Sequence, residues 1–216
     1  MTTPITHSTQ CKRCRRAGEK LFLKGDRCNS AKCAIVKRNF PPGVHGSVKG
    51  QPKLTNYGQQ LKAKQKAKRI YGLMEKQFRN YFEKAVAKVG NTGESMFKIL
   101  ELRLDNTIYR LGLASSRNLA NQVVGHGHVL VNGKKVDIPS YQVKTGDIIS
   151  IKKSSLESPI FKNLSDKLAN KEKKEAMAPW LSLNEKVLEG KVTSSPKLGD
   201  MEMGIDWQMI VEFYSK

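Results

Sequence analysis

The sequence lacks any hydrophobic run that could cross a membrane or direct secretion. No stretch of the 216 residues approaches the roughly 20 apolar residues that a membrane helix needs. The N-terminus, MTTPITHSTQ, has no apolar core of the kind found in secretory signals. These absences predict a cytoplasmic protein with no membrane partner.

Acidic residues are scarce beside basic ones. The chain has 19 Asp and Glu against 39 Lys and Arg, which gives a net charge of +20. Residues 1–90 contain 21 of the basic residues and only 4 of the acidic ones, so 17 of the 20 net charges lie there. So positive a field predicts a polyanionic partner, with nucleic acid favoured over an anionic membrane surface.

Catalytic constellations are also missing. Serine, histidine and aspartate residues occur, but in none of the arrangements that activate a nucleophile. We therefore expect a binding protein, not an enzyme, and no small-molecule substrate. The hydrophobic fraction of 38% is low for one compact globule, so small separate cores are expected.

Only four cysteines are present, and they form two close pairs: Cys11 with Cys14, and Cys28 with Cys33. In a reducing cytosol such pairs are typical of metal ligands, and four thiolates complete a tetrahedron around Zn²⁺. An iron–sulfur cluster uses the same ligands, and four reduced, unmetallated thiols are the third interpretation. A metal enclosed by four cysteines would be structural, because no position stays open for a substrate.

Basic residues surround these cysteines. A bound metal would fix a segment that is too polar to fold alone, so that its basic side chains face RNA in a defined pattern. The RNA contacts expected from this segment are Arg13, Arg15 and Arg16.

Helical periodicity runs over residues 54–88, with Gly72 as the expected break between two helices. Lysines surround the first helix, which predicts that it is too basic to be buried and that it faces phosphates. The RNA contacts expected from it are Lys62, Lys66 and Arg69. A further helical run is expected over 94–111, after a turn that Thr92 caps.

The stretch 115–151 combines a short helix with a hairpin. Gly125 is expected to end the helix, because glycine readily adopts the left-handed backbone conformation. Asn132-Gly133 lies between two strand-like runs and predicts a type I′ hairpin turn. The polar face of the helix, two histidines and the hairpin lysines can then share one surface suited to RNA.

From this stretch we expect contacts with RNA along both the helix and the hairpin. The residues are Arg117, Asn121, Gln122, His126, His128, Asn132, Lys134 and Lys135.

Two segments near the C-terminus carry weaker signals. Mixed charges over 163–176 predict an exposed helix. The apolar segment 205–214 is expected to dock on another part of the protein.

Motifs in the central stretch resemble a known RNA-binding domain. They are Ser-Arg-Asn-x-Ala at 116–120, Gly-His-Val at 127–129, Val-Asn-Gly at 131–133, Pro-Ser at 139–140 and Gly-Asp at 146–147. They are similar to the domain named after small-subunit ribosomal protein four, which pseudouridine synthases and some aminoacyl-tRNA synthetases also carry. The domain alone therefore leaves open an RNA-modifying enzyme or a generic RNA chaperone.

The flanking sequence favours the ribosomal family itself. The Pro-Pro-Gly linker at 40–43 and the segment 77–82 resemble that family. Pseudouridine synthases place a catalytic aspartate in an Arg-Leu-Asp setting, but after the RNA-binding domain, whereas here the tripeptide 103–105 precedes it. We therefore expect Asp105 to be a structural partner of Arg103 or Arg110.

The resemblance implies an α+β fold in three parts: an N-terminal metal-binding module of four cysteines, a mainly helical domain, and an inserted small α+β RNA-binding domain. The predicted boundaries are 1–45 for the metal module and linker, 46–100 for the helical domain, completed by 178–216, and 101–177 for the inserted domain, with its core at 115–151.

The resemblance also implies a function. It predicts a structural constituent of the small ribosomal subunit that binds the rRNA of that subunit directly and nucleates early assembly of its body. It further predicts contacts with neighbouring ribosomal proteins and with mRNA where the message enters the subunit, and an effect on translational accuracy.

Overall fold

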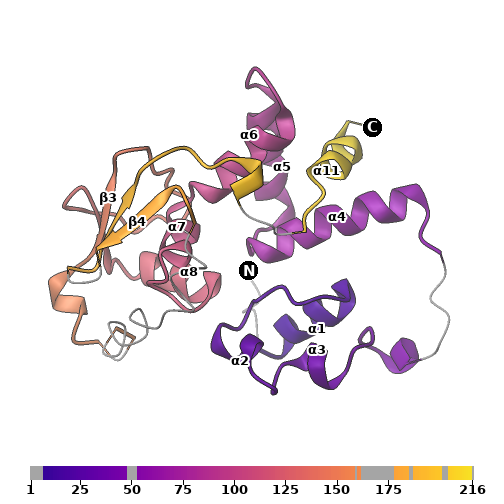
Figure 1. Ribbon diagram of the computed structural model, residues 1–216. Helices are drawn as coiled ribbons and strands as arrows, with labels where there is room; N and C mark the ends of the chain where they lie inside the picture. Colours follow the sequence, from indigo (N-terminus) through magenta and orange to yellow (C-terminus); the bar gives the residue numbers. More distant parts are fainter. Residues whose placement is uncertain are drawn as a thin grey trace. The chain divides into compact units, whose positions relative to one another are not determined.

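The computed structural model describes residues 7–47, 53–158, 160–161, 178–184, 187–200 and 204–215 (Figure 1). Helices and an antiparallel sheet confirm the α+β class. Residue contacts divide the chain into two units, Met1–Arg79 with Gly204–Lys216, and Asn80–Met203. The domain boundaries expected from the sequence differ from this division and stay a prediction. The helix expected at 163–176 lies outside the described residues.

Short helices begin the first unit. They are α1 (His7–Ala17), α2 (Asp26–Asn29) and α3 (Ala34–Lys37), followed by the 3-10 turn η1 (Val44–Ser47). Helix α1 packs against α3 and against α4 (Asn56–Ile70). Its buried side holds Cys14 and Ala17, which lie with Leu21 and Leu23 in a small core.

The predicted break between two helices at Gly72 is confirmed. Thr55 caps α4, because its hydroxyl accepts a hydrogen bond from the N–H of Gly58 at 3.2 Å. Gly72 has φ 67°, a left-handed conformation that turns the chain from α4 into α5 (Glu75–Val86).

The expected docking of the C-terminal segment is also confirmed. Helix α11 (Trp207–Tyr214) packs along α4 within the first unit. The ring centroids of Tyr57 and Phe213 lie 5.7 Å apart, and those of Phe78 and Tyr214 lie 6.3 Å apart. Aromatic contacts therefore join α11 to α4 and α5.

The prediction of one continuous helix over 94–111 is wrong, because the chain forms two helices there, α6 (Thr92–Glu101) and α7 (Leu104–Arg110). Backbone pairing with a distant segment interrupts the run. The N–H of Val143 donates to the carbonyl of Leu102 at 2.9 Å, and the N–H of Leu104 donates to the carbonyl of Tyr141 at 2.9 Å. An extended residue between them cannot continue a helix.

The cap of α6 differs from the prediction as well. Asn91, not Thr92, is the N-cap residue, and its side-chain oxygen accepts from the N–H groups of Gly93 and Glu94 at 2.8 and 3.2 Å. Thr92 is the first residue of the helix itself.

Helix α8 (Arg117–Gly125) ends at Gly125, as expected, but the left-handed residue that follows it lies two positions further along. Gly127, not Gly125, is left-handed, with φ 71°. The N–H of Gly127 donates to Val124 at 2.8 Å, and the N–H of His128 donates to Val123 at 3.2 Å. This is the Schellman arrangement, which places its glycine beyond the last helical turn.

The second unit also contains a five-stranded antiparallel sheet in the order β2-β1-β3-β5-β4, beside which α7 and α8 lie in Figure 1. The strands are β1 (Val129–Val131), β2 (Lys134–Lys135), β3 (Ile148–Ile151), β4 (Leu181–Asn184) and β5 (Glu189–Val192), with 3-10 turns at η2 (Lys153–Ser155) and η3 (Leu198–Asp200). The predicted hairpin is confirmed, since Asn132 and Gly133 have φ 50° and 78° between β1 and β2.

Strands β4 and β5 occupy a place that the sequence did not predict. Residues 178–216 were expected to complete the helical domain, but β5 pairs with β3 of the RNA-binding domain, and β4 pairs with β5. Within the described part of this segment, α11 is the element that packs on α4. Strand pairing over such a separation leaves no local sequence signal.

Described helices do not include one that is both long and apolar enough to span a bilayer.

Candidate nucleic-acid interface

Four of the expected RNA contacts lie on the polar face of α8 or directly after its last residue. Ser116 caps this helix by accepting from the N–H of Leu119 at 3.3 Å. Asn121, Gln122 and His126 are exposed, and Arg117 is half-buried. The opposite side of the helix is anchored by the buried residues Ala120, Val123 and Val124. Helical periodicity therefore separates the core from the polar surface as predicted.

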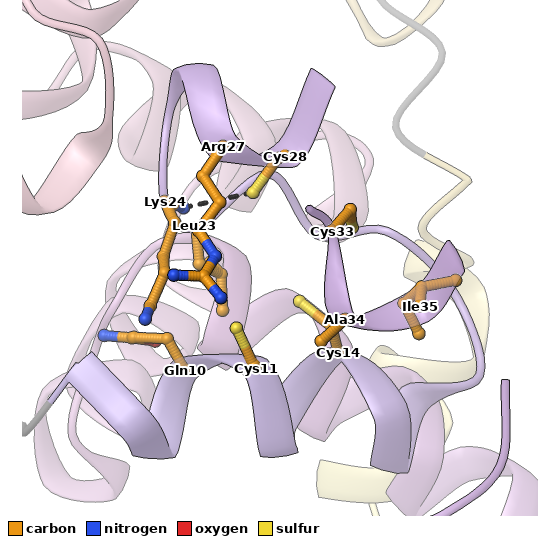
Figure 2. Close-up of a pocket in the computed structure, with 10 residues that line it drawn as sticks. All are labelled: Gln10, Cys11, Cys14, Leu23, Lys24, Arg27, Cys28, Cys33, Ala34 and Ile35. Carbon is orange, nitrogen blue, oxygen red and sulfur yellow. Dashed lines mark hydrogen bonds between the residues drawn. The ribbon is translucent and has the colours of Figure 1, made fainter. Parts of the chain in front are cut away.

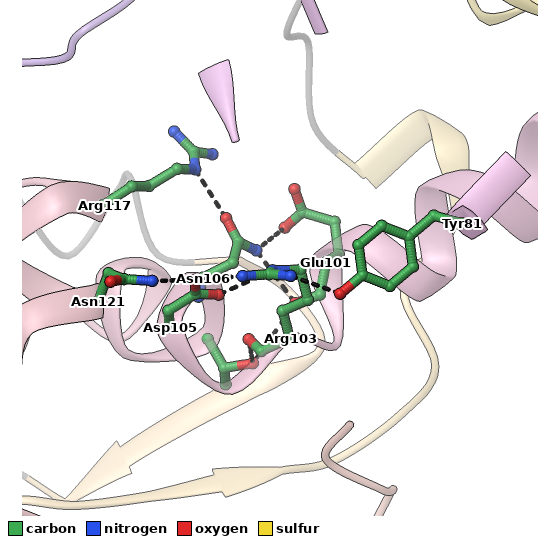
Figure 3. Close-up of polar contacts among 8 residues, drawn as sticks. Tyr81, Glu101, Arg103, Asp105, Asn106, Arg117 and Asn121 are labelled. Atoms are coloured by element: carbon green, nitrogen blue, oxygen red, sulfur yellow. Dashed lines mark hydrogen bonds and ion pairs between the residues drawn. The ribbon is translucent and has the colours of Figure 1, made fainter. Parts of the chain in front are cut away.

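A buried ion pair lies beneath this surface (Figure 3). The guanidinium of Arg103 donates to both carboxylate oxygens of Asp105, at 3.0 and 2.6 Å, and to the hydroxyl of Tyr81 at 2.5 Å. Burial lowers the pKa of Arg103, but the hydrogen bonds and charges of Asp105 and Tyr81 outweigh it, and the net pKa is raised. The predicted structural role of Asp105, with Arg103 as its partner, is confirmed.

Asp105 also connects this pair to α8. Its carboxylate accepts from the side-chain amide of Asn121 at 3.1 Å and from the N–H of Asn106 at 2.8 Å. The Asn121 side chain is therefore held by α7 before any RNA arrives.

A second set of hydrogen bonds holds the Arg117 side chain in place. The carboxylate of Glu101 is fully buried and accepts two hydrogen bonds from Arg110, both at 2.9 Å. Glu101 also accepts from the side-chain amide of Asn106 at 2.9 Å, and the amide oxygen of Asn106 accepts from Nε of Arg117 at 2.8 Å. The Arg117 guanidinium lies over the ring of Tyr109, 4.4 Å from its centroid.

The sequence did not indicate the three residues that hold Arg117 in place: Glu101, Asn106 and Tyr109. Asn106 and Tyr109 are three positions apart on α7, a spacing that places them on one helix face and could have indicated a shared role. The pairing of Glu101 with Arg110 crosses the break between α6 and α7, which was not predicted.

In the hairpin, the two lysine side chains are exposed to solvent, whereas the asparagine side chain is hydrogen-bonded within the protein. Lys134 and Lys135 are exposed, and Lys135 lies 4.0 Å from Asp137 in a loose surface pair. The side chain of Asn132 donates to Asp147 at 2.8 Å and accepts from the N–H of Ile148 at 2.9 Å. Asn132 thus holds the turn against β3.

The two histidines differ in their surroundings. His126 is exposed. His128 is half-buried, with Nδ1 2.9 Å from the hydroxyl of Ser155 and its ring edge-on to Phe161 at 6.0 Å. His128 therefore contributes to packing within the unit, whereas His126 presents its ring to solvent.

The four cysteines line one pocket in the first unit, together with residues of α1 and α3 (Figure 2). Cys14, Cys28 and Cys33 are buried, and Cys11 is half-buried. Burial first, and then the nearby cysteines, raise the pKa values of the Cys14 and Cys28 thiols. The N–H of Lys24 lies 3.3 Å from the sulfur of Cys28. Across the described ranges, however, no three Cys, His, Asp or Glu side chains are arranged to hold a metal ion.

Several basic residues of α1 and α4 have partners inside the first unit. Arg15 donates to the carbonyls of Phe40 and Pro41 at 2.9 and 3.2 Å, and its guanidinium lies 4.7 Å from the centroid of the Phe40 ring. Lys66 pairs with Glu19 at 2.7 Å and donates to the carbonyl of Gly204. Arg15 and Lys66 were expected to contact RNA, but the structure gives both an internal role.

The prediction that α4 is too basic to be buried is wrong. Lys64 is 7% exposed and pairs with Glu75 at 2.8 Å, as does Lys68. The Lys64 ammonium also lies over the ring of Phe213, 4.3 Å from its centroid. Carboxylate and aromatic partners thus allow a lysine-rich face to pack against α5 and α11. Lys62 remains exposed on the same helix.

The sequence matches known protein families over most of its length, including the residues described above. A model of the ribosomal protein S4/S9 N-terminal domain matches residues 6–101, and a model of the S4 domain matches residues 102–149. Small ribosomal subunit protein uS4A of Alkaliphilus metalliredigens is 53% identical over 206 residues, covering 95% of this chain and 96% of that protein. The uS4 proteins of Halothermothrix orenii and Clostridioides difficile are 53% and 52% identical with the same coverage. With such identity along nearly its whole length, the chain belongs to the uS4 family of small ribosomal subunit proteins.

Proposed function

We propose that this protein is a structural constituent of the small ribosomal subunit and binds the rRNA of that subunit directly. The observation that carries the proposal is the 53% identity to small ribosomal subunit proteins over 95% of the chain. Its role is binding and not catalysis, since Asp105, the best candidate for a catalytic residue, is committed to a buried ion pair. The protein would act in the cytoplasm as part of the ribosome.

The proposed RNA contacts fall into two sets, one in each unit. In the second unit, Gln122, His126, Lys134 and Lys135 are exposed, while Arg117 and Asn121 are held in position by α7. In the first unit, the candidates are Arg13, Arg16, Lys62 and Arg69. Held side chains lose less conformational freedom on binding, which supports the fixed Arg117 and Asn121 as contacts.

Membership of the family is the sole support for three more specific roles within the ribosome. They are nucleation of early assembly of the subunit body, contact with neighbouring ribosomal proteins, and contact with mRNA where it enters the subunit. An effect on translational accuracy would follow from the last of these.

A structural Zn²⁺ is part of the proposal, with an iron–sulfur cluster as the alternative. Four thiols from two short-spaced pairs line one pocket, and this donor set fits either group. The ion would be held by Cys11, Cys14, Cys28 and Cys33, and would link α1 to α2, which contains Cys28, and to Cys33 at the start of α3. Binding must draw these sulfurs closer than they lie here.

Elemental analysis tests the metal. Protein purified with and without oxygen should contain one zinc per chain in both preparations. Iron in the anaerobic preparation would support the cluster, and neither metal in either preparation would contradict both.

The RNA proposal is tested by filter binding. We expect tight, salt-sensitive binding to small-subunit rRNA, with an affinity well above that for random RNA of equal length. Equal affinity for both RNAs would contradict the ribosomal role and favour a generic RNA chaperone.

A further inference from the structure

Asn106 lies between a buried carboxylate and the arginine that begins α8 (Figure 3). It is 2% exposed, and its amide nitrogen donates to the carboxylate of Glu101 at 2.9 Å and to the backbone carbonyl of Glu101 at 3.0 Å. The carboxylate is paired with Arg110, so it and the carbonyl are both acceptors only. These two acceptors fix which way round the amide lies, and its oxygen must face Arg117.

Arg117 is held by α7 on one edge and one face of its guanidinium. Its Nε donates to the amide oxygen of Asn106 at 2.8 Å, and the guanidinium lies over the ring of Tyr109, 4.4 Å from the centroid. In Figure 3 the two terminal nitrogens of Arg117 point away from the other labelled residues. The contacts with α7 therefore orient the edge of the guanidinium that carries paired N–H donors.

Stability alone does not account for this arrangement. Glu101 is fully buried with Arg110, and a buried ion pair often stabilises a fold no more than apolar residues of similar volume would. Apolar residues, however, would offer the amide nitrogen of Asn106 no acceptor, and the amide could then lie either way round. The buried pair thus has a consequence at the surface, because it determines how a half-buried arginine is held.

We propose that Asn106, oriented by Glu101, is a positioning residue for RNA binding. Asn106 is buried, so it acts through Arg117 and not by touching RNA. The inference rests on the proposed function, in which Arg117 is an RNA contact. An oriented guanidinium edge can meet two acceptor atoms of RNA at once, and holding it in advance lowers the entropy lost on binding.

A double-mutant cycle in the full chain, with small-subunit rRNA as the ligand, tests this role. Asn106→Ala should weaken rRNA binding about two- to tenfold, because the Arg117 side chain must then be ordered on binding. The same substitution should cause no further loss when it is added to Arg117→Ala. Equal losses in the two backgrounds would overturn the proposal, since a merely structural role does not depend on Arg117.

Asn91→Ala is the matched control for lost stability. Asn91 caps α6 in the same unit, and its exposed side chain accepts two hydrogen bonds. The variant should lower the stability of the fold and leave the rRNA affinity unchanged. A loss of affinity as large as that of Asn106→Ala would show that general destabilisation explains both effects, and would also overturn the proposal.

Tyr109→Leu gives a second cycle that leaves the hydrogen bonds of buried Glu101 in place. Tyr109 is half-buried, and its ring lies beneath the guanidinium of Arg117. Loss of the ring should weaken rRNA binding in the wild-type background and not in Arg117→Ala. An effect of the same size in both backgrounds would contradict the positioning of Arg117 by α7.

Heteronuclear NMR of the Arg117 Nε–H group gives a readout without RNA. Exchange of this hydrogen with water should be slow in the wild type and faster in Asn106→Ala, and equal rates would contradict the hold on Arg117. A wild-type protein that prefers rRNA to random RNA but gives additive losses in the cycles would overturn the positioning role alone. Equal affinity of the wild type for both RNAs would contradict the proposed function itself, whatever the exchange rates.

Discussion

At the scale of single residues, the ion pair of Arg103 and Asp105 should be the most sensitive polar contact of the second unit. The side chains are 4% and 6% exposed, and three hydrogen bonds join Arg103 to Asp105 and Tyr81. Asp105→Ala leaves a buried guanidinium without its carboxylate, and should lower the free energy of unfolding by about 3–5 kcal/mol. Urea denaturation followed by circular dichroism measures this change.

Asp137→Ala is the matched control, because Asp137 is 59% exposed and lies 4.0 Å from Lys135. Its effect should stay within about 0.5 kcal/mol. Removing both charges of the buried pair with Arg103→Met and Asp105→Ala should restore part of the loss. Equal effects of the two aspartate variants would contradict the structural role of Asp105.

Glu75 should make stability depend on pH. Burial raises its pKa, but hydrogen bonds from Lys64, Lys68 and Tyr214 outweigh burial and lower the pKa from 4.5 to about 2. A carboxylate with a lowered pKa stabilises the fold above pH 4.5, and this contribution is lost as the pH falls from there towards 2. The Glu75 side chain is 48% exposed, so the contribution should not exceed about 1 kcal/mol.

The comparison of wild type with Glu75→Gln isolates this group. Their difference in free energy of unfolding should be largest near neutral pH and should shrink as the solution becomes acidic. A difference that stays constant with pH would show that the carboxylate charge does not hold α4, α5 and α11 together.

At the scale of elements, the end of α8 provides a paired test of two glycines. Gly127 has φ 71°, so Gly127→Ala should lose about 1–2 kcal/mol of stability from backbone strain. Gly125 is helical, with no atom within 4 Å of an added Cβ, so Gly125→Ala should be neutral or stabilising by up to about 1 kcal/mol. Thermal unfolding of both variants checks this order, and the reverse order would mean that Gly125, not Gly127, adopts the left-handed conformation.

Elements set by nearby residues were predictable from sequence. The turn at Gly72 and the hairpin at Asn132-Gly133 depend on the left-handed conformations that these residues tolerate, and both were found. The apolar segment 205–214 was likewise predicted to dock, and it does so as helix α11 on α4.

Elements set by distant residues were not predictable. The break between α6 and α7 requires backbone pairing with residues 141–143, and the place of β5 requires pairing with β3. The burial of Lys64 depends on Phe213 and Tyr214, which come from the far end of the chain. No local pattern encodes such partners, so the helix found as α4 was predicted to be too basic for burial and to face phosphates.

The same reasoning applies to the candidate RNA interface. Exposure of Gln122 follows from helix periodicity. Lys134 and Lys135 are both exposed, because they form the short edge strand β2. The internal partners of Arg15, Lys66 and Asn132 come from loops and from residues far along the chain. Only the structure therefore distinguishes the basic and polar side chains that bind within the protein from those that remain available to RNA.

At the scale of the whole molecule, net charge and family membership point to the same partner. Residues 1–90 carry 17 of the 20 net positive charges, although some of their lysines are paired internally. Each unit keeps a separate set of exposed basic or polar side chains. Binding that uses both sets should depend steeply on salt, since every phosphate contact adds to the counterions released.

The most direct test of the ribosomal role is co-sedimentation of the native protein with small ribosomal subunits after a high-salt wash. The wash removes proteins held only by non-specific charge attraction. We predict that this protein stays with the small subunit in amounts equal to those of the subunit itself. Its release into the supernatant, with the subunits otherwise intact, would contradict a role as a structural constituent.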